Sequence, residues 1–255
     1  MRIRPASILS IILVAVAANA QVKSPEPVKT KPPFESSLQA VVVITNGWDS
    51  ISGTARLFER KDTASKWRPN GKEFRIVVGR SGLAWGEEKE PNIPIAKFKK
   101  EGDGNAPAGR FPLTSAFGTA SKPVGVAFDY TKLGPYTECV DDSRSSFYNR
   151  IVNRMQVGNF DWKSSEKMLA VGEQYSLGLF VGYNSFPIKR GAGSCIFLHV
   201  WKGPDSGTSG CTAMERRDLE RIVAWATPAK DPYLVQMPAS IYEKNRKAWN
   251  LPKFK

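Results

Sequence analysis

Short runs of β-branched and aromatic residues recur along this chain of 255 residues and constrain its fold more than any other feature. Turn-forming residues separate the runs, among them Asn46-Gly47 and Pro69-Asn70-Gly71. Such runs bounded by turns are typical of strands. We therefore expect a mainly β fold with short helices, built on an antiparallel sheet or sandwich. The predicted strands are residues 40–45, 54–59, 73–78, 177–183, 195–200 and 233–237.

One helix is predicted after the last cysteine. The segment from Thr212 to Glu215 has the form of a capping box, in which the two side chains satisfy backbone N–H groups at a helix start. Apolar residues then recur at helical spacing until Thr227-Pro228, at Leu219, Ile222, Val223 and Ala226. This pattern places Cys211 at the entrance of the helix, where free N–H groups and the helix dipole favour a thiolate.

The N-terminus has the features of an export signal. Arg2 and Arg4 precede an apolar run at residues 6–18 that is too short to span a bilayer comfortably. Residues 18–20, Ala-Asn-Ala, supply the small side chains that a signal peptidase accepts. We predict a secretory signal at residues 1–20, with an uncleaved membrane anchor as the alternative. The expected location is the periplasm or cell wall, with no stable membrane insertion after cleavage.

Composition divides the rest of the chain into three parts. Residues 21–37 carry four prolines among lysines and serines, which is typical of a flexible arm. Residues 38–240 contain all of the predicted strands and have the size of a single domain. Residues 241–255 form a basic C-terminal tail.

The net charge indicates the kind of partner. The formal charge of +13 at pH 7 falls to +11 when the two arginines of the signal are removed, and the basic residues are scattered rather than gathered. Scattered positive charge favours an anionic partner such as a cell wall or a membrane surface. We do not expect nucleic acid as a partner, because the chain lacks a basic-aromatic recognition motif.

The only histidine of the chain, His199, lies twelve positions before Cys211. A thiol becomes a useful nucleophile when a nearby base takes its proton, and histidine does so at little cost near neutral pH. A glycine-rich loop at residues 203–210 joins the two, and Gly210 lets the backbone approach a substrate closely. We expect a thiol pKa for Cys211 below its ordinary value of about 8.5. A metal site is not expected with one histidine.

Three cysteines in an oxidising compartment allow one disulfide and one free thiol. If Cys211 stays reduced, the remaining pair is Cys139 and Cys195. A buried, unpaired Cys195 in an apolar strand is the alternative, and sequence does not fix the Cα separation that decides between them.

Three segments resemble the L,D-transpeptidase (YkuD-type) catalytic domain. His199 followed by Thr208-Ser-Gly-Cys211 is similar to the family signature, a histidine and then Ser/Thr-His-Gly-Cys, with Ser209 in place of the second histidine. Residues 100–111 resemble the family's Gly-Asp-x-x-Thr-Pro-x-Gly-x-Phe stretch, and residues 182–184 resemble a segment of one divergent branch. The resemblance covers most of residues 40–238, and Ala213 stands where many members carry Arg or Asn.

The resemblance implies an L,D-transpeptidase-like β-sandwich and an exported cysteine acyltransferase of peptidoglycan stem peptides, with roles in cell wall biogenesis and cell shape. Cys211 would attack a stem-peptide carbonyl, with His199 as its base and the carbonyl of Val200 orienting the histidine. Backbone N–H groups of Ser209, Gly210 and Cys211 would form the oxyanion hole. No metal or cofactor is implied.

Substrate contacts are expected from polar and aromatic residues near these segments. The candidates are Arg110, Tyr183, Asn184, Trp201 and Lys202, with Arg216 as a further source of positive charge. Two other functions are compatible with the same sequence. One is a peptidoglycan carboxypeptidase or endopeptidase, in which water resolves the acyl-enzyme at the same Cys-His pair. The other is a non-catalytic cell-wall-binding protein.

The predicted signal gives a direct test. Exported protein should begin at Gln21, because Ala-Asn-Ala at residues 18–20 is the one good cleavage site after the apolar run. N-terminal sequencing of the exported protein measures this. A membrane-bound form that retains Met1 would instead support the anchor.

Overall fold

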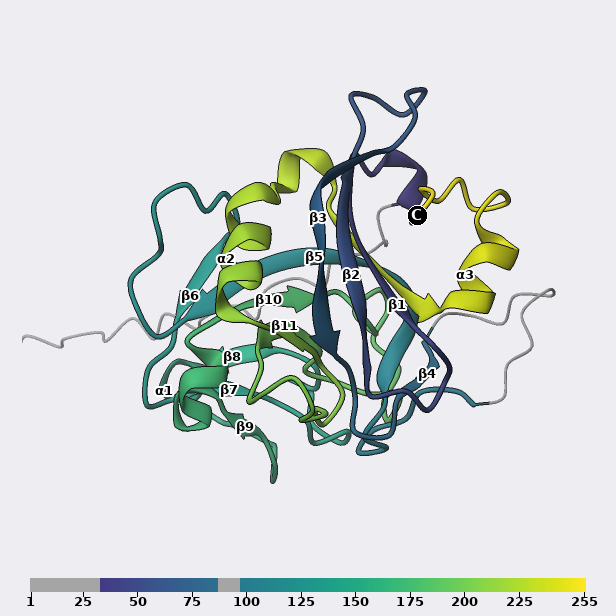
Figure 1. The fold of residues 1–255 in the computed structure, drawn as a ribbon. Helices are drawn as coiled ribbons and strands as arrows, with labels where there is room; N and C mark the ends of the chain where they lie inside the picture. The colour runs from purple at the N-terminus through teal and green to yellow at the C-terminus, as the bar shows by residue number, and fades with distance from the viewer. Residues whose placement is uncertain (1–32, 87–96) are drawn as a thin grey trace, which may run out of the picture.

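The computed structural model describes residues 33–86 and 97–255 (Figure 1). The predicted signal at residues 1–20 and most of the predicted arm at residues 21–37 lie outside this part of the chain. Within it the mainly β class is confirmed, with a ten-stranded sheet and a three-stranded sheet.

The large sheet contains β1 (Gln39–Thr45), β2 (Ser52–Glu59), β3 (Arg68–Val77), β4 (Leu83–Trp85), β5 (Ala106–Gly118), β6 (Tyr130–Lys132), β10 (Leu177–Val181), β11 (Phe197–Val200), β12 (Thr212–Met214) and β13 (Tyr233–Pro238). The small sheet contains β7 (Thr137–Cys139), β8 (Ile151–Asn153) and β9 (Glu166–Lys167). The α-helices are α1 (Arg154–Val157), α2 (Arg216–Trp225) and α3 (Ala239–Asn245). Short 3-10 helices are η1 (Phe34–Ser36), η2 (Met168–Tyr175) and η3 (Pro228–Lys230).

Strand β5 closes the large sheet into a barrel. Its first half pairs antiparallel with β13, from Gly109 to Pro112, and its second half pairs antiparallel with β10, from Leu113 to Gly118. The ring runs β10-β11-β12-β3-β2-β1-β13-β5 and returns to β10. A sandwich has two separate sheets, but here β5, which is 13 residues long, hydrogen-bonds to strands on both sides and makes them one continuous sheet.

All six predicted strands are present. Seven strands in the described part of the chain were not predicted, and β5 is the longest of them; the others are β4, β6, β7, β8, β9 and β12. The interior of β5 carries Pro107, Gly109 and Pro112, which in sequence indicate turns. The structure accommodates them because neighbouring strands change along β5. The carbonyl of Pro112, for example, accepts a hydrogen bond from Gly182 N–H at 2.7 Å.

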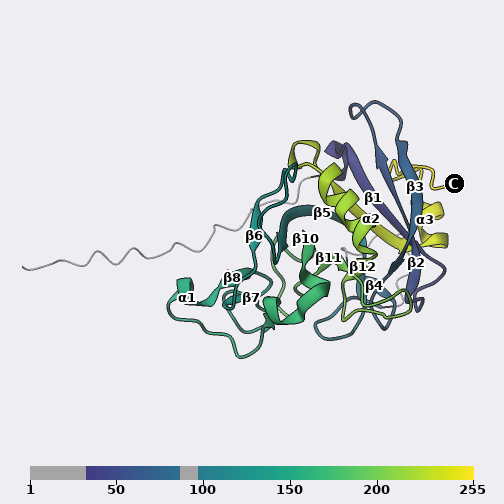
Figure 2. The ribbon, with the colours of Figure 1, turned by 60° about the vertical axis from the view of Figure 1, so that its left-hand side comes forward.

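Helix α2 confirms the predicted apolar stripe and corrects its start. Leu219, Ile222 and Val223 are buried on the face of α2 that contacts β10 and β11 (Figure 2). The prediction of a capping box at Thr212, and hence of Cys211 at a helix start, is wrong. Thr212 begins strand β12, and its hydroxyl lies 2.6 Å from the side-chain oxygen of Gln236 inside the barrel rather than on a helix N-terminus.

Both predicted boundaries of the domain need correction. Phe34, placed in the flexible arm, is buried and meets the ring of Tyr233 edge-on, with ring centroids 5.3 Å apart. The residues predicted as a basic tail begin inside α3, and Leu251 and Phe254 are buried against the core. The domain thus extends from η1 to the last residues of the chain because aromatic and aliphatic side chains at both ends complete the apolar core.

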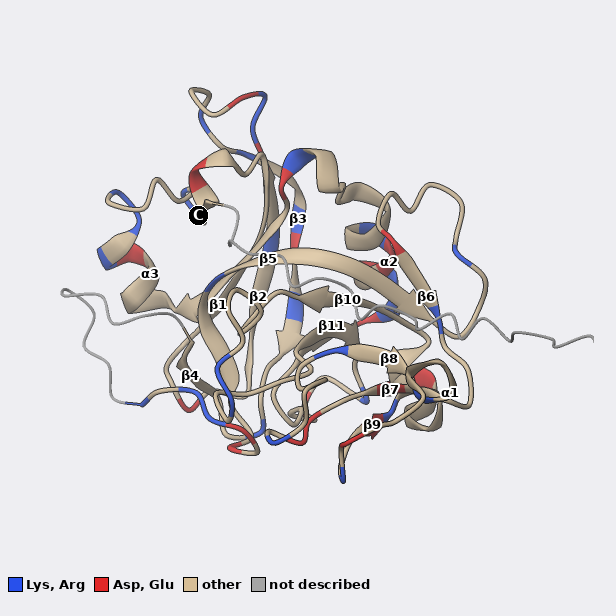
Figure 3. Ribbon diagram, turned by 180° about the vertical axis from the view of Figure 1, so that it is seen from behind, with Lys and Arg blue, Asp and Glu red and all other residues tan. Residues whose placement is uncertain are grey.

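The small sheet and α1 form a projection at one end of the barrel (Figure 2). Lysine and arginine are spread over the whole ribbon among acidic residues, in agreement with the scattered charge of the sequence (Figure 3). None of the helices in the described part of the chain is both long and apolar enough to cross a bilayer.

The packing of the C-terminal segment can be tested by truncating Leu251, which is 4% exposed. Leu251→Ala should lower the free energy of unfolding by about 2–5 kcal/mol, because it leaves a cavity in the core. Urea denaturation measures the change. Lys253→Ala, at an exposed position two residues away, should change it by less than about 0.5 kcal/mol. Equal midpoints for the two variants would show that the segment is a loose tail.

Candidate active site

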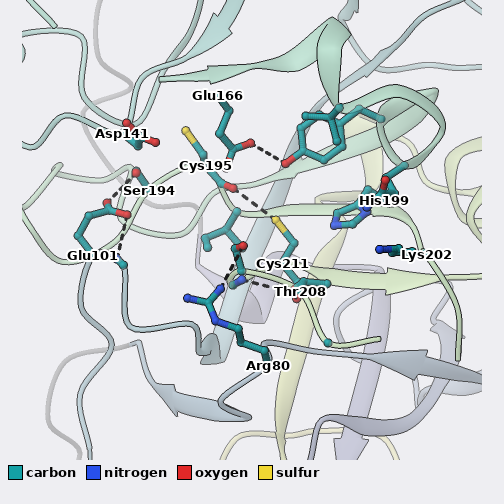
Figure 4. A pocket seen from close by; sticks show the side chains of 18 of the residues that line it. Arg80, Glu101, Asp141, Glu166, Ser194, Cys195, His199, Lys202, Thr208 and Cys211 are labelled. Atoms are coloured by element: carbon teal, nitrogen blue, oxygen red, sulfur yellow. Dashed lines mark hydrogen bonds between the residues drawn. The ribbon is translucent and has the colours of Figure 1, made fainter. Parts of the chain in front are cut away.

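A pocket of about 690 Å³ is lined by residues of β11, of the segment that leads into it and of β9 in the small sheet (Figure 4). Both Cys211 and His199 line it. The two residues reach the pocket from neighbouring strands, because β11 and β12 pair in parallel with His199 opposite Ala213 and Leu198 opposite Thr212. This register places Cys211, just before β12, next to Phe197 at the start of β11.

The thiol of Cys211 is buried and held by backbone groups. It accepts a hydrogen bond from Phe197 N–H at 3.3 Å and donates one to the carbonyl of Cys195 at 3.4 Å. Burial raises the pKa of the Cys211 thiol, and the nearby carboxylate of Glu166 raises it further. The prediction of a lowered thiol pKa is therefore wrong for this structure, since the helix start that it assumed is absent and desolvation disfavours the thiolate.

The imidazole of His199 is fixed by its neighbour. Its Nδ1 lies 2.8 Å from the carbonyl oxygen of Val200, so Nδ1 carries the proton and donates it, because a carbonyl oxygen can only accept. This tautomer leaves Nε2 as an acceptor. Burial lowers the pKa of His199 to about 4, so the ring is neutral at pH 7.

The glycine-rich loop before Cys211 is organised by Thr208, whose role the sequence analysis missed. The Thr208 hydroxyl donates to the carbonyl of Cys211 at 2.7 Å and accepts from Gly210 N–H at 3.1 Å. Arg80 ties the loop to the barrel through a backbone bond from its N–H to the carbonyl of Thr208, 2.7 Å, and its guanidinium donates to the Ser209 hydroxyl. Of the three predicted oxyanion donors, Gly210 N–H thus has an internal partner that an oxyanion must displace.

Two further residues beside the thiol carry no sequence pattern that singles them out. Tyr175, at the end of η2, lies with its ring edge-on to the ring of His199, with centroids 5.3 Å apart. Its hydroxyl donates to the carboxylate of Glu166 on β9 at 2.5 Å. Both side chains line the pocket with Cys211.

The pocket lining is charged with both signs. Glu101, Asp141 and Glu166 supply the negative charge, and Arg80, Lys99 and Lys202 supply the positive charge. Lys99 is buried and its ammonium lies 2.8 Å from the carboxylate of Asp103. Figure 4 shows the three acidic side chains on the side of the pocket away from His199 and Lys202.

Among the predicted substrate contacts, the structure places only Lys202 in this pocket. The other candidates have structural partners elsewhere. The guanidinium of Arg110 lies 3.9 Å from the ring centroid of Trp249, and Tyr183 is buried with its hydroxyl bonded to the carbonyl of Ala192. The side-chain amide of Asn184 donates to the backbone carbonyls of Lys189 and Gly193. The backbone N–H of Trp201 donates to the carbonyl of Met214, and Arg216 pairs with Glu173.

Cys139 and Cys195 form a disulfide, which removes the alternative of an unpaired Cys195. The bond joins β7 of the small sheet to the segment that leads into β11. The carbonyl of Cys195 accepts a hydrogen bond from the thiol of Cys211. The disulfide therefore holds in place a residue, Cys195, that contacts the predicted nucleophile. In the described residues, no group of three or more His, Cys, Asp or Glu side chains is arranged to hold a metal ion.

Comparison with known proteins defines the class. The sequence profile of the L,D-transpeptidase catalytic domain, YkuD, matches residues 52–236, and the chain belongs to this family. A solved structure, the helical cell shape determining protein Pgp2 from Campylobacter jejuni, is similar at 18% identity and a TM-score of 0.39. The match covers 80% of this chain and 51% of that one, so the chain spans about half the length of Pgp2. Curated proteins give no significant match.

The disulfide closes a loop with a sequence separation of 56 and should therefore stabilise the fold. Replacing both partners, Cys139→Ala with Cys195→Ala, should lower the free energy of unfolding by about 2–5 kcal/mol, because the unfolded chain regains conformational freedom. Urea denaturation under non-reducing conditions measures this. Wild type with added reductant should approach the variant, and a midpoint unmoved by either treatment would argue against a stabilising bond.

Proposed function

We propose that this protein is an exported cysteine acyltransferase of peptidoglycan stem peptides, an L,D-transpeptidase that works through an acyl-enzyme on Cys211. The observation that carries the proposal is the placement of Cys211 and a neutral, backbone-oriented His199 in one pocket. Family membership supports the cell-wall substrate. The export signal predicted at residues 1–20 supports a periplasmic or cell-wall location.

The geometry supports a stepwise acyl transfer. As the sulfur of Cys211 bonds to a stem-peptide carbonyl carbon, its proton passes to Nε2 of His199, and the carbonyl oxygen becomes an oxyanion. When the tetrahedral intermediate collapses, the peptide C–N bond breaks and the leaving amine of the terminal D-residue takes the proton from His199. An amine of a second stem then attacks the thioester, loses a proton to His199 and releases Cys211 as a thiolate that is reprotonated.

The protonation states of Cys211 and His199 before the reaction are consistent with these steps. A buried thiol with a raised pKa and a histidine with a pKa of about 4 are both neutral at pH 7, so the proton moves during attack and not before it. The carbonyl of Val200 keeps the Nδ1 proton in place and stabilises the imidazolium that forms. Stem peptides carry both carboxylates and amines, and a pocket lined with both acidic and basic side chains is complementary to them.

Muropeptides incubated with the purified protein and analysed by mass spectrometry test the proposal. Wild type should give cross-linked dimers, because an amine acceptor resolves the thioester. Trimmed monomers would show that water is the acceptor, which is a carboxypeptidase or endopeptidase. Unchanged muropeptides would show a binding protein.

Substitution of the two residues tests their roles. Cys211→Ala should abolish turnover, and His199→Ala should lower it by about 100-fold or more, as loss of a general base commonly does. Circular dichroism melts should show that both variants fold. Turnover by Cys211→Ala near the wild-type rate would remove the mechanism.

A further inference from the structure

Glu166 and Tyr175 form a hydrogen-bonded pair beside the thiol that the acyl-transfer steps above do not use. The Tyr175 hydroxyl donates to the Glu166 carboxylate at 2.5 Å. Glu166 comes from β9 of the small sheet, whereas Tyr175 ends η2, so the pair links the projection to the pocket.

Tyr175 touches both residues of the candidate catalytic pair. Its ring is 6% exposed and lies edge-on to His199 at 5.3 Å and to Phe197 at 5.4 Å, as measured between ring centroids. Tyr175 and Cys211 line the same pocket, and each affects the pKa of the other's side chain. The phenol is thus placed between a carboxylate and the sulfur.

A phenol hydroxyl has one proton and can donate it to one acceptor at a time. While Glu166 is a carboxylate it takes that proton, and Tyr175 has none to give to Cys211. The sulfur then has the N–H of Phe197 as its donor. If Glu166 is neutral, its own proton can bond the phenol oxygen, and the phenol proton is free to bond the sulfur, where it would stabilise a thiolate.

We propose that Glu166 sets the direction of the Tyr175 hydrogen bond and thereby controls the reactivity of Cys211, which is lower when Glu166 is ionised. Glu166 is a positioning residue that acts through Tyr175. The inference rests on the proposed function only in taking Cys211 as the nucleophile.

The surroundings of Glu166 place its titration near neutral pH. Burial raises its pKa to about 7, and Asp141 and Glu101 across the pocket add to the rise. Two nearby lysines form ion pairs with other carboxylates. Lys167, its neighbour on β9, pairs with Glu138 at 2.6 Å, and Lys99 pairs with Asp103.

The other charged or titratable groups that line the pocket with Glu166 and Tyr175 are Cys211, His199, Arg80 and Lys202. The sign follows from the direction of the shift. Below about pH 7 Glu166 is neutral and the phenol proton is available to the sulfur. Above it the carboxylate holds the proton and also repels a thiolate, so the relative reactivity of Cys211 falls.

The test is the rate of iodoacetamide alkylation of Cys211 between pH 5.5 and 8.5, mapped by mass spectrometry to the peptide that contains it. We expect wild type and Glu166→Gln to react at similar rates near pH 6. Near pH 8.5 the variant should react roughly tenfold faster, because its side chain cannot ionise. Asp141→Asn, which removes another pocket carboxylate that no bond joins to Tyr175, should show a much smaller change between the two pH values.

Tyr175→Phe separates the hydrogen-bond relay from simple charge repulsion. In the Tyr175→Phe background, Glu166→Gln should lose most of its advantage at pH 8.5. A rate ratio of Glu166→Gln to wild type that stays constant across the pH range would overturn the proposal. So would an advantage that persists undiminished without the tyrosine hydroxyl.

The pH profile of Cys211 alkylation in the wild-type protein is a test that does not depend on any variant folding correctly. An isolated thiol below its pKa alkylates about tenfold faster for each pH unit. The wild-type profile should rise less steeply above about pH 7, and an unbroken rise would contradict the proposal. Alkylation does not depend on peptidoglycan, so a pH break at Cys211 with unchanged muropeptides would defeat the proposed acyl transfer and leave this inference standing.

Discussion

Closure of the barrel by β5 is the constraint on which the rest of the structure depends. One strand supplies hydrogen bonds to β13 with its first half and to β10 with its second, so no sheet edge remains between them. In the closed ring β11 and β12 pair with each other, and each is held on its other side by a further strand of the ring, β10 and β3 respectively. Residues on those two strands are then positioned by the backbone of the whole barrel.

The candidate site takes its precision from the register of β11 and β12. Leu198 pairs with Thr212 across the two parallel strands, so the residues that precede them, Phe197 and Cys211, lie side by side. The Phe197 N–H can therefore donate to the sulfur of Cys211. His199 and the carbonyl of Val200 belong to the same strand. Neither member of the pair relies on a long flexible side chain, which suits a reaction in which misplacement by about 1 Å is costly.

The sequence predicted local features well and long-range features poorly. Strand β1 and the stripe of α2 are encoded by neighbouring residues, through apolar runs and helical spacing, and both are present. Strand β5 was missed because its prolines and glycine signal turns, and only pairing with distant strands makes it extended. The helix start was misplaced because Thr212 meets Gln236, 24 residues away, and nothing in the local pattern records that contact. Glu166 and Tyr175 likewise meet through the fold and belong to no motif.

The connectivity of the disulfide has a consequence for how the protein matures. Cys139 and Cys195 are consecutive cysteines, and Cys211 comes after both. When a chain enters an oxidising compartment from its N-terminus, the first two thiols to arrive are the native partners. Oxidation in order of arrival therefore gives the correct bond without a rearrangement step. On the proposed export route, Cys211 arrives with no thiol left to capture it, and in the folded structure it is free and buried.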